Sequence, residues 1–203
     1  MAERGVEGIE SVAVLGGGTM GGGIAGHLAR AGVRVALVDA SPDLSRTARE
    51  RLLERTRGHV EAGLLPPDAT DRTARIETPA DMEAAVAGVD LVIEAVPEDA
   101  TLKDEVLRRC AAAAPVEAII ASNTSSLPIE GLAASVSEPG RFLGVHWFNP
   151  PEWTPGIEII PAQATEPQAC GSGAMRRQRS SRWDQAKHSA CGLRFCSTKP
   201  PMA

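Results

Sequence analysis

Several features are scarce or missing in this chain, and each excludes a class of function. Aromatic residues make up only 3% of its 203 residues, and residues 1–160 contain no basic stripe, so nothing supports nucleic-acid binding. No segment approaches the roughly 20 consecutive apolar residues that cross a bilayer, and the N-terminus lacks the apolar core of a signal peptide. We therefore expect a cytoplasmic protein that binds neither nucleic acid nor membrane.

Paired cysteine motifs are also missing. The four cysteines, Cys110, Cys170, Cys191 and Cys196, show no C-x-x-C spacing and fit neither a zinc site nor a disulfide framework. Free thiols in a reducing compartment, and no metal site, are the expectation. The length of the chain is enough for one domain with a full core and little more.

A glycine-rich turn between two apolar runs is the most informative feature that the chain does have. Residues 12–39 combine a strand, the turn, a helix and a second strand. Gly16 can adopt backbone angles closed to other residues, Gly18 lets the main chain approach a pyrophosphate, and Gly21 lets the helix lie against the strand. This combination is typical of a dinucleotide-binding βαβ unit.

The helix after this turn supplies the other half of a phosphate site. Its free N–H groups and the positive end of its dipole attract phosphate, which makes its opening residues, Thr19 and Met20, candidate cofactor contacts. Asp39 ends the second apolar run, where a carboxylate can accept hydrogen bonds from the adenosine ribose and would repel a 2′-phosphate. The pattern therefore predicts NAD rather than NADP. An Asp at this place can also simply cap the next helix.

Strands and helices alternate beyond this unit. Predicted helices cover 42–62, 79–88 and 100–113, and predicted buried strands cover 90–96 and 116–121. Alternation of this kind implies an α/β fold with a Rossmann-type, doubly wound, mainly parallel sheet. Such a sheet binds ligands at the carboxyl ends of its strands.

The composition changes abruptly near residue 164. Residues 165–203 contain seven Lys or Arg, two Asp or Glu, one Leu and no Ile or Val, whereas the whole chain has 21 basic and 26 acidic residues. So few apolar side chains cannot offset the entropy of ordering the segment. We therefore expect a nucleotide-binding domain over 1–164 and a basic, disordered or irregular tail over 165–203. A nucleic-acid-binding tail and a reading-frame shift near residues 164–170 are the alternatives.

Four further segments resemble the 3-hydroxyacyl-CoA dehydrogenases and occur in that family's order. They are Glu94-Ala-Val-Pro-Glu98, Ala121-Ser-Asn-Thr-Ser-Ser-Leu127, Gly144-Val-His-Trp-Phe-Asn-Pro150 and Gly156-Ile-Glu-Ile-Ile160. With the glycine turn, they extend the resemblance to the family's NAD-binding domain over residues 10–164. The resemblance implies oxidation of the 3-hydroxyl of an acyl-CoA to the 3-ketoacyl-CoA, with NAD as cofactor, in fatty-acid metabolism such as β-oxidation.

His146 is the candidate general base. Oxidation of a secondary alcohol needs a group that takes the hydroxyl proton, and His titrates in the useful range. Glu158 interrupts an apolar run, where an unpaired carboxylate would be costly, so we expect it to be buried beside a partner. In the resembling family the equivalent His and Glu form the catalytic pair. On strand alternation alone, Glu158 could instead face solvent from an edge strand, and His146 could be an ordinary core histidine.

The loop after residue 121 is rich in hydroxyl and amide groups that can bind a substrate oxygen or the nicotinamide carboxamide. The resemblance implies that Ser125 contacts the substrate hydroxyl and that Asn123 lies near the cofactor. It also implies that Glu98 and Lys103 line the NAD cleft. These residue types also serve turns, caps and solvated helix ends, which is the alternative interpretation.

Members of the resembling family continue into a helical domain that serves as substrate lid and dimer interface, and no such domain is expected here. The family's homodimer is therefore not expected either, and the acyl-CoA substrate would have only half a pocket. Trp147 and residues 151–155 depart from the Phe and aliphatic residues common in the family, which leaves the acyl-chain preference open. A dehydrogenase of a free hydroxy acid and an inactive NAD-binding remnant are the alternative functions.

Overall fold

The computed structural model describes residues 9–154 and 156–170. Its elements are β1 (Ser11–Leu15), α1 (Thr19–Arg30), β2 (Arg34–Val38), α2 (Pro42–Glu61), α3 (Ala69–Ala74), α4 (Met82–Val86), β3 (Leu91–Glu94), α5 (Ala100–Ala113), β4 (Ile119–Ser122), α6 (Ile129–Ala133), the 3-10 helix η2 (Pro139–Arg141), β5 (Phe142–Trp147) and β6 (Ile157–Pro161). The strands form one sheet in the order β2-β1-β3-β4-β5-β6. All neighbouring strands are parallel except β5 and β6, so the prediction of a Rossmann-type, mainly parallel sheet is confirmed.

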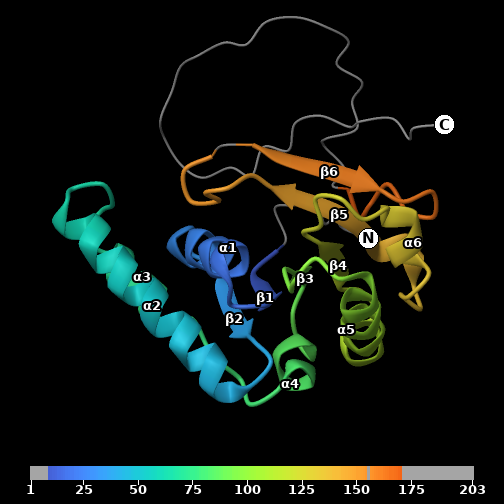
Figure 1. Cartoon of the computed structure of the whole chain (residues 1–203), viewed down its shortest axis with the longest axis horizontal. Helices are drawn as coiled ribbons and strands as arrows, with labels where there is room; N and C mark the ends of the chain where they lie inside the picture. Colours follow the sequence, from blue (N-terminus) through green and yellow to red (C-terminus); the bar gives the residue numbers. More distant parts are fainter. Residues whose placement is uncertain (1–8, 155, 171–203) are drawn as a thin grey trace, which may run out of the picture.

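Helices cover both faces of the sheet (Figure 1). The helices α1, α2 and α3 pack together on one side, and α4, α5 and α6 lie on the other. Burial on both faces explains why the strands read as nearly continuous apolar runs. In β1, for example, Val12 and Val14 belong to the core cluster that includes α1, whereas Ala13 and Leu15 belong to the cluster that includes α4 and α5.

The start of α2 and the end of β3 are each set by a hydrogen bond between a side chain and the nearby backbone. The helix α2 begins as predicted, because the Ser41 side chain accepts a hydrogen bond from the Leu44 N–H at the first turn. The strand β3 ends at Glu94, earlier than the predicted residue 96. The reason is that the Val96 N–H donates to the Glu94 carboxylate rather than to a neighbouring strand.

The described part of the predicted tail packs onto the domain. The Thr165 hydroxyl donates to the Phe142 carbonyl at 2.6 Å, and the Glu166 N–H donates to the Gly140 carbonyl at 2.7 Å. Ala169 and Cys170 are buried in the core. Packing therefore continues past residue 164 to Cys170, while the expectation of disorder for 171–203 lies outside the described residues.

The two cysteines in the described ranges, Cys110 and Cys170, are free, as predicted. Burial, with a smaller contribution from the charge of Glu94, raises the pKa of the Cys110 thiol to about 12. Cys191 and Cys196 lie outside the described residues. Within these ranges, no group of three or more His, Cys, Asp or Glu side chains could hold a metal ion.

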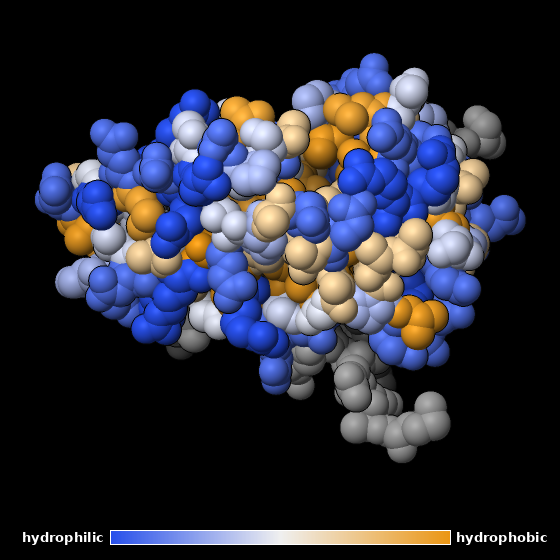
Figure 2. Space-filling view, turned by 90° about the horizontal axis from the view of Figure 1, so that it is seen from below, coloured by the Kyte–Doolittle hydropathy of each residue, from blue (hydrophilic) through white to orange (hydrophobic). Residues whose placement is uncertain are grey.

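The surface shows hydrophobic side chains scattered among hydrophilic ones on the face drawn in Figure 2. Leu44, Leu64 and Val116 are large exposed apolar side chains that lie far apart in the sequence, whereas the other two in the described ranges, Phe148 and Trp153, both lie in the segment after β5. Scattered apolar side chains of this kind are normal on a globular domain. Across the described ranges, no helix combines the length and the apolar character needed for a membrane span.

Candidate active site

The glycine turn follows β1 and contacts the ends of its two neighbouring strands, β2 and β3. Gly16 has a φ of +102°, and its N–H donates to the Val38 carbonyl at 2.7 Å. A Cβ on Gly16 would stand 2.6 Å from the Ala95 carbonyl oxygen, and a Cβ on Gly21 would stand 1.9 Å from the Gly16 carbonyl oxygen. Because neither position has room for a side chain, α1 can lie directly against the turn.

The start of α1 is open to a bound anion. Gly18 is its N-cap residue and makes no side-chain cap, and the first turn, which begins with Thr19 and Met20, holds no acidic side chain. A Cβ on Gly18 would meet nothing within 4 Å, so the space in front of this backbone is free. Exposed N–H groups at the positive end of a helix dipole suit a pyrophosphate. These residues therefore fit the phosphates of NAD.

Asp39 is held at the end of β2 beside this turn. Its Oδ2 accepts the Gly17 N–H at 2.8 Å, its Oδ1 accepts the Ala40 N–H at 2.7 Å, and its own N–H donates to the Ser45 hydroxyl at 2.8 Å. The cap of α2 is Ser41, so Asp39 is not serving as that cap. A carboxylate preorganised beside a phosphate cradle suits the ribose hydroxyls of NAD.

Replacement of Asp39 by alanine is expected to weaken NAD binding about tenfold to a hundredfold, since hydrogen bonds to a charged group contribute about 1.5–3 kcal/mol. Affinity for NADP is expected to change less, because a repulsive charge is lost together with the hydrogen bonds. Calorimetric titration with both cofactors measures the two effects. Asp43→Ala is the matched control, because Asp43 is exposed in the first turn of α2 and pairs with Arg46. Equal losses for NAD and NADP would contradict the assignment.

His146 and Glu158 lie directly opposite each other on the antiparallel strands β5 and β6. Opposed residues of an antiparallel pair place their side chains on the same face. Here the His146 Nδ1 is 3.0 Å from the Glu158 Oε2. The Glu158 side chain lies on an edge strand and is 32% exposed, so it is less buried than expected, yet it has the expected partner. The pairing makes Nδ1 the protonated nitrogen and leaves Nε2 as the basic one.

Neighbouring groups fix the orientation of this strand end. Trp147 is buried and its ring packs against His27 of α1, with ring centroids 5.5 Å apart. The centroid of the Phe148 ring lies 5.0 Å from the centroid of the His146 ring. Asn123, which follows β4, accepts the Trp147 N–H at 2.9 Å through its Oδ1. Because the Oδ1 is the acceptor in this bond, the NH₂ group of the Asn123 amide points away from the Trp147 N–H.

Glu98 holds the turn that contains Ser125. Its Oε1 accepts the Thr124 hydroxyl at 2.5 Å, the Ser126 hydroxyl at 2.9 Å, and the N–H groups of Ser125 and Ser126 at 3.1 and 3.0 Å. Burial alone would raise the pKa of Glu98, but the hydrogen bonds from Thr124 and Ser126 and the nearby charge of Lys103 lower it to about 2. We call residues Thr124–Ser126 the serine turn. Ser125 is exposed and follows β4, the strand next to the one that carries His146.

This depressed pKa predicts an acid-sensitive contribution to stability. The carboxylate stabilises the fold at pH values above its ordinary pKa of 4.5, and the contribution is lost as the pH falls toward 2. Because the side chain is 36% exposed, solvent screening limits the contribution to roughly 1–2 kcal/mol. Urea denaturation should therefore show Glu98→Gln less stable than the parent at about pH 7, with a smaller difference at about pH 3. A difference that is constant with pH would contradict this.

A buried ion pair beneath the serine turn was not predicted from the sequence. The Glu94 side chain is fully buried and its Oε1 lies 2.7 Å from the Nζ of Lys103, which is 1% exposed. The Glu94 Oε2 accepts the Ser122 hydroxyl at 2.5 Å. A carboxylate at the end of an otherwise apolar strand was the available signal for this pair. Lys103 therefore points into the domain rather than along an open cleft.

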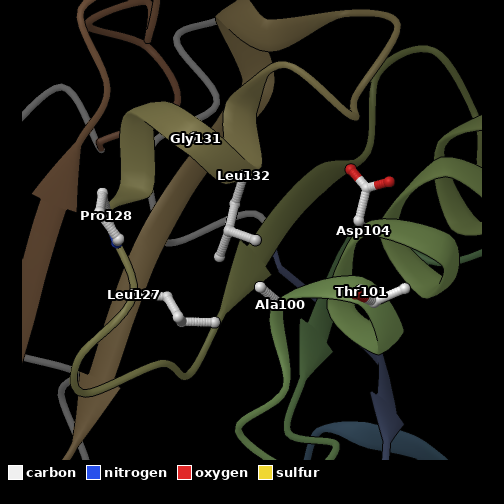
Figure 3. A pocket seen from close by; sticks show the side chains of 7 residues that line it. All are labelled: Ala100, Thr101, Asp104, Leu127, Pro128, Gly131 and Leu132. Carbon is white, nitrogen blue, oxygen red and sulfur yellow. The ribbon is translucent and has the colours of Figure 1, made fainter.

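A shallow cavity of about 370 Å³ adjoins the serine turn (Figure 3). It lies between the start of α5 and α6, and its apolar wall includes Leu127, the residue that follows the turn. Its lining residues are Ala100, Thr101, Asp104, Leu127, Pro128, Gly131 and Leu132. The Leu127 N–H donates to the Thr124 hydroxyl at 3.0 Å, so the turn and this wall are structurally linked.

The sequence is similar to a family of known dehydrogenases. A family model described as "3-hydroxyacyl-CoA dehydrogenase, NAD binding domain" matches residues 11–175. The chain is 40% identical over 160 residues to 5-formyl-3-hydroxy-2-methylpyridine 4-carboxylate 5-dehydrogenase of Mesorhizobium japonicum, a match that covers 79% of this chain and 51% of that protein. It is 36% identical over 162 residues to 3-hydroxybutyryl-CoA dehydrogenase of Mycobacterium tuberculosis, with coverages of 79% and 57%.

A solved structure shares the fold. The crystal structure of (S)-3-hydroxybutyryl-CoA dehydrogenase PaaH1 from Ralstonia eutropha superposes with a TM-score of 0.75 at 32% identity, over 79% of this chain and 57% of that one. The chain thus spans about half the length of the curated relatives named above. The region of similarity includes the glycine turn and both members of the His–Glu pair.

Proposed function

Because this chain belongs to the NAD binding domain family of 3-hydroxyacyl-CoA dehydrogenases, we propose that it takes part in oxidation of the 3-hydroxyl of an acyl-CoA to the 3-ketoacyl-CoA. The observation that carries the proposal is the 3.0 Å contact between His146 and Glu158. His146 lies near the carboxyl end of β5, and β5 runs parallel to β1, so the pair lies on the same side of the sheet as the glycine turn that follows β1. Dehydrogenation of an alcohol requires a general base close to the bound nucleotide, and the carboxyl ends of parallel strands are where such a nucleotide binds.

In this proposal His146 is the general base. Its Nε2 accepts the proton of the substrate 3-hydroxyl while its Nδ1–H donates to Glu158, which stabilises the imidazolium that forms. Ser125 donates a hydrogen bond to the reacting oxygen. Asn123 lies near the cofactor and donates through its NH₂ group to the nicotinamide carboxamide. Removal of the hydroxyl proton raises the electron density on C3, from which the hydride leaves.

The nucleotide part of the site is assigned to the residues of the glycine turn and to Asp39. Gly16 and Gly21 shape the turn, the backbone from Gly18 through Thr19 and Met20 binds the pyrophosphate, and Asp39 binds the adenosine ribose. NAD, when bound, supplies the hydride acceptor for the reaction.

A second candidate substrate class is a small free carboxylic acid that carries no CoA. The 40% identity to a dehydrogenase of a pyridine carboxylate favours it. The catalytic roles of His146 and Glu158 are the same for both substrate classes.

Paired assays of the chain distinguish these functions. Calorimetry measures NAD binding, and NADH formation is followed with 3-hydroxybutyryl-CoA and with free 3-hydroxybutyrate. Faster turnover of the thioester is the expected result, and faster turnover of the free acid would favour the second class. Binding of NAD without NADH formation from either compound would indicate an inactive NAD-binding remnant and would overturn the proposed activity.

A further inference from the structure

Glu152 is a buried carboxylate in the loop between β5 and β6, and it has no part in the proposed reaction. Its side chain is only 7% exposed, and its Oε1 lies 2.5 Å from the Nη2 of Arg55 in α2. A carboxylate without a partner would be costly to bury. Arg55 is 41% exposed, so the ion pair joins a buried group on the loop to a helix at the surface.

We call residues Pro150–Thr154 the strap. The N–H groups of Trp153 and Thr154 both donate to the Pro150 carbonyl, at 3.1 and 3.0 Å. These two hydrogen bonds make the strap one compact turn. The loop that contains it reaches from the end of β5 over α1 before the chain enters β6 (Figure 1).

The strap packs on two helices. A Cβ on Gly23 of α1 would stand 2.5 Å from the Pro151 Cγ and 3.0 Å from the Glu152 Oε2, so the strap rests directly on this helix. The Trp153 ring makes an edge-to-face contact with His59 of α2. Because Trp153 is 47% exposed, that contact excludes little water. The ion pair of Glu152 is therefore the main link between the strap and α2.

Positive charge surrounds the Glu152 carboxylate where the strap meets the helices. Arg55 of α2 faces its Oε1. Burial lowers the pKa of His27 and of Arg30 in α1, and the charge of Glu152 acts against both shifts. Glu152 is thus the negative centre of a group of basic side chains from α1 and α2, and charge as well as packing holds the strap.

Both ends of the strap meet at Phe148, whose ring lies beside His146. Phe148 precedes the strap in the sequence, and Gly156 follows it. A Cβ on Gly156 would stand 3.2 Å from the Phe148 Cδ2, so the backbone after the strap packs against this ring. The ring centroids of Phe148 and His146 are 5.0 Å apart. A movement of the strap on the helices would therefore also move the ring beside His146.

We propose that Glu152 is a positioning residue that holds the strap on α1 and α2 and thereby fixes the Phe148 ring beside the His146 imidazole. The strap thus links the surroundings of the base to α1, the helix that begins at the glycine turn. The use of this placement in catalysis rests on the proposed function above. The placement itself is measurable without turnover.

Residue-resolved hydrogen exchange of the full chain tests whether Glu152 holds the strap. Exchange of the Trp153 and Thr154 N–H groups is expected to accelerate about threefold to tenfold in Glu152→Gln, an effect between those of an exposed and of a buried ion pair. The glutamine keeps the size of the side chain, and the partly exposed Arg55 stays solvated when the charge is lost. Unchanged exchange would overturn the proposal.

Two further variants keep this measurement decisive. Arg55→Met alone leaves a buried carboxylate unpaired and can unfold the domain. Arg55→Met/Glu152→Gln removes both charges and is expected to accelerate exchange as much as Glu152→Gln alone, because the two residues act as a pair. Arg46→Met is the matched control on α2, because Arg46 pairs with Asp43. It should leave exchange in the strap unchanged.

The imidazole proton signals of His146 in NMR spectra report whether the strap acts on Phe148. An aromatic ring shifts nearby proton signals through its ring current, and Phe148→Leu, which removes the ring, measures that shift. At a fixed pH, Glu152→Gln is expected to move the His146 signals in the same direction as Phe148→Leu, and the double variant should match Phe148→Leu alone. Faster exchange in the strap without a change in the His146 signals would overturn the proposal.

Steady-state kinetics and calorimetry separate this role from the proposed function. In Glu152→Gln, kcat for NADH formation from 3-hydroxybutyryl-CoA should fall about tenfold, whereas the NAD dissociation constant should change less than about twofold. Weaker NAD binding with normal exchange in the strap would contradict the positioning role. Faster exchange and moved His146 signals, in a chain whose parent oxidises no hydroxy substrate, would refute the proposed function and leave the positioning role intact.

Discussion

Replacement of His146 by glutamine is expected to lower the rate of 3-hydroxyacyl-CoA oxidation by a factor of about 10²–10⁴, the usual contribution of a positioned general base. The glutamine amide can still contact Glu158, but it cannot accept the hydroxyl proton. NAD affinity is expected to stay within about twofold, because the glycine turn and Asp39 are untouched. NADH formation and calorimetry measure the two quantities, with the chain alone or joined to the C-terminal half of a family member.

Two companion variants make this result specific. Glu158→Gln should lower the rate by a smaller factor, because the base is retained but its tautomer and its imidazolium lose the carboxylate. His59→Gln is the control, since His59 lies in α2 and makes an edge-to-face contact with Trp153 rather than a contact with the His–Glu pair. A full rate in His146→Gln would exclude His146 as the base.

Substitution of alanine for Gly21 is expected to weaken NAD binding strongly and to destabilise the domain. The new Cβ would stand 1.9 Å from the Gly16 carbonyl oxygen, a backbone atom that cannot move without displacing the turn. Overpacking of this kind typically lowers the free energy of unfolding by about 1–3 kcal/mol. NAD affinity should fall on the order of a hundredfold, as for the loss of about two charge-assisted hydrogen bonds to the phosphates.

Gly18→Ala separates the two effects. Its Cβ would meet nothing within 4 Å, so stability measured by urea denaturation should change little. The methyl group would stand in the open space before α1, and NAD binding should weaken there without unfolding. Equal stability and equal NAD affinity in Gly21→Ala and the parent chain would show that the helix does not pack against the turn as described.

The parts of the fold that the sequence predicted are those set by local chemistry. Apolar runs that end in polar motifs predicted the parallel sheet, because strands covered on both faces have no polar alternation. The glycine spacing predicted the turn, since only glycine fits at Gly16 and Gly21. The pairing of His146 with Glu158 was expected from the resemblance and from the cost of an unpaired charge, and the strand register accounts for it physically.

The parts that the sequence did not predict depend on contacts between distant segments. From the sequence, Lys103 is expected to be a solvent-exposed residue near the start of a helix. In the fold its side chain is buried and its Nζ contacts the Glu94 carboxylate. Glu98 was assigned to the cofactor cleft, yet one of its oxygens is occupied by the serine turn. Composition also placed the end of the domain at residue 164, although Ala169 and Cys170 are buried in the core. These two small residues belong to no recognisable apolar run, so composition does not reveal their burial.

A crystal structure of the chain with NAD tests most directly whether the nucleotide cradle and the His–Glu pair form one site. The pyrophosphate should lie on the backbone of Gly18, Thr19 and Met20, with the nicotinamide ring at the ends of β4 and β5, beside the Nε2 of His146. A nicotinamide bound on the opposite side of the sheet edge from His146, or a pyrophosphate away from the start of α1, would contradict the assignment of this chain to hydride-transfer chemistry.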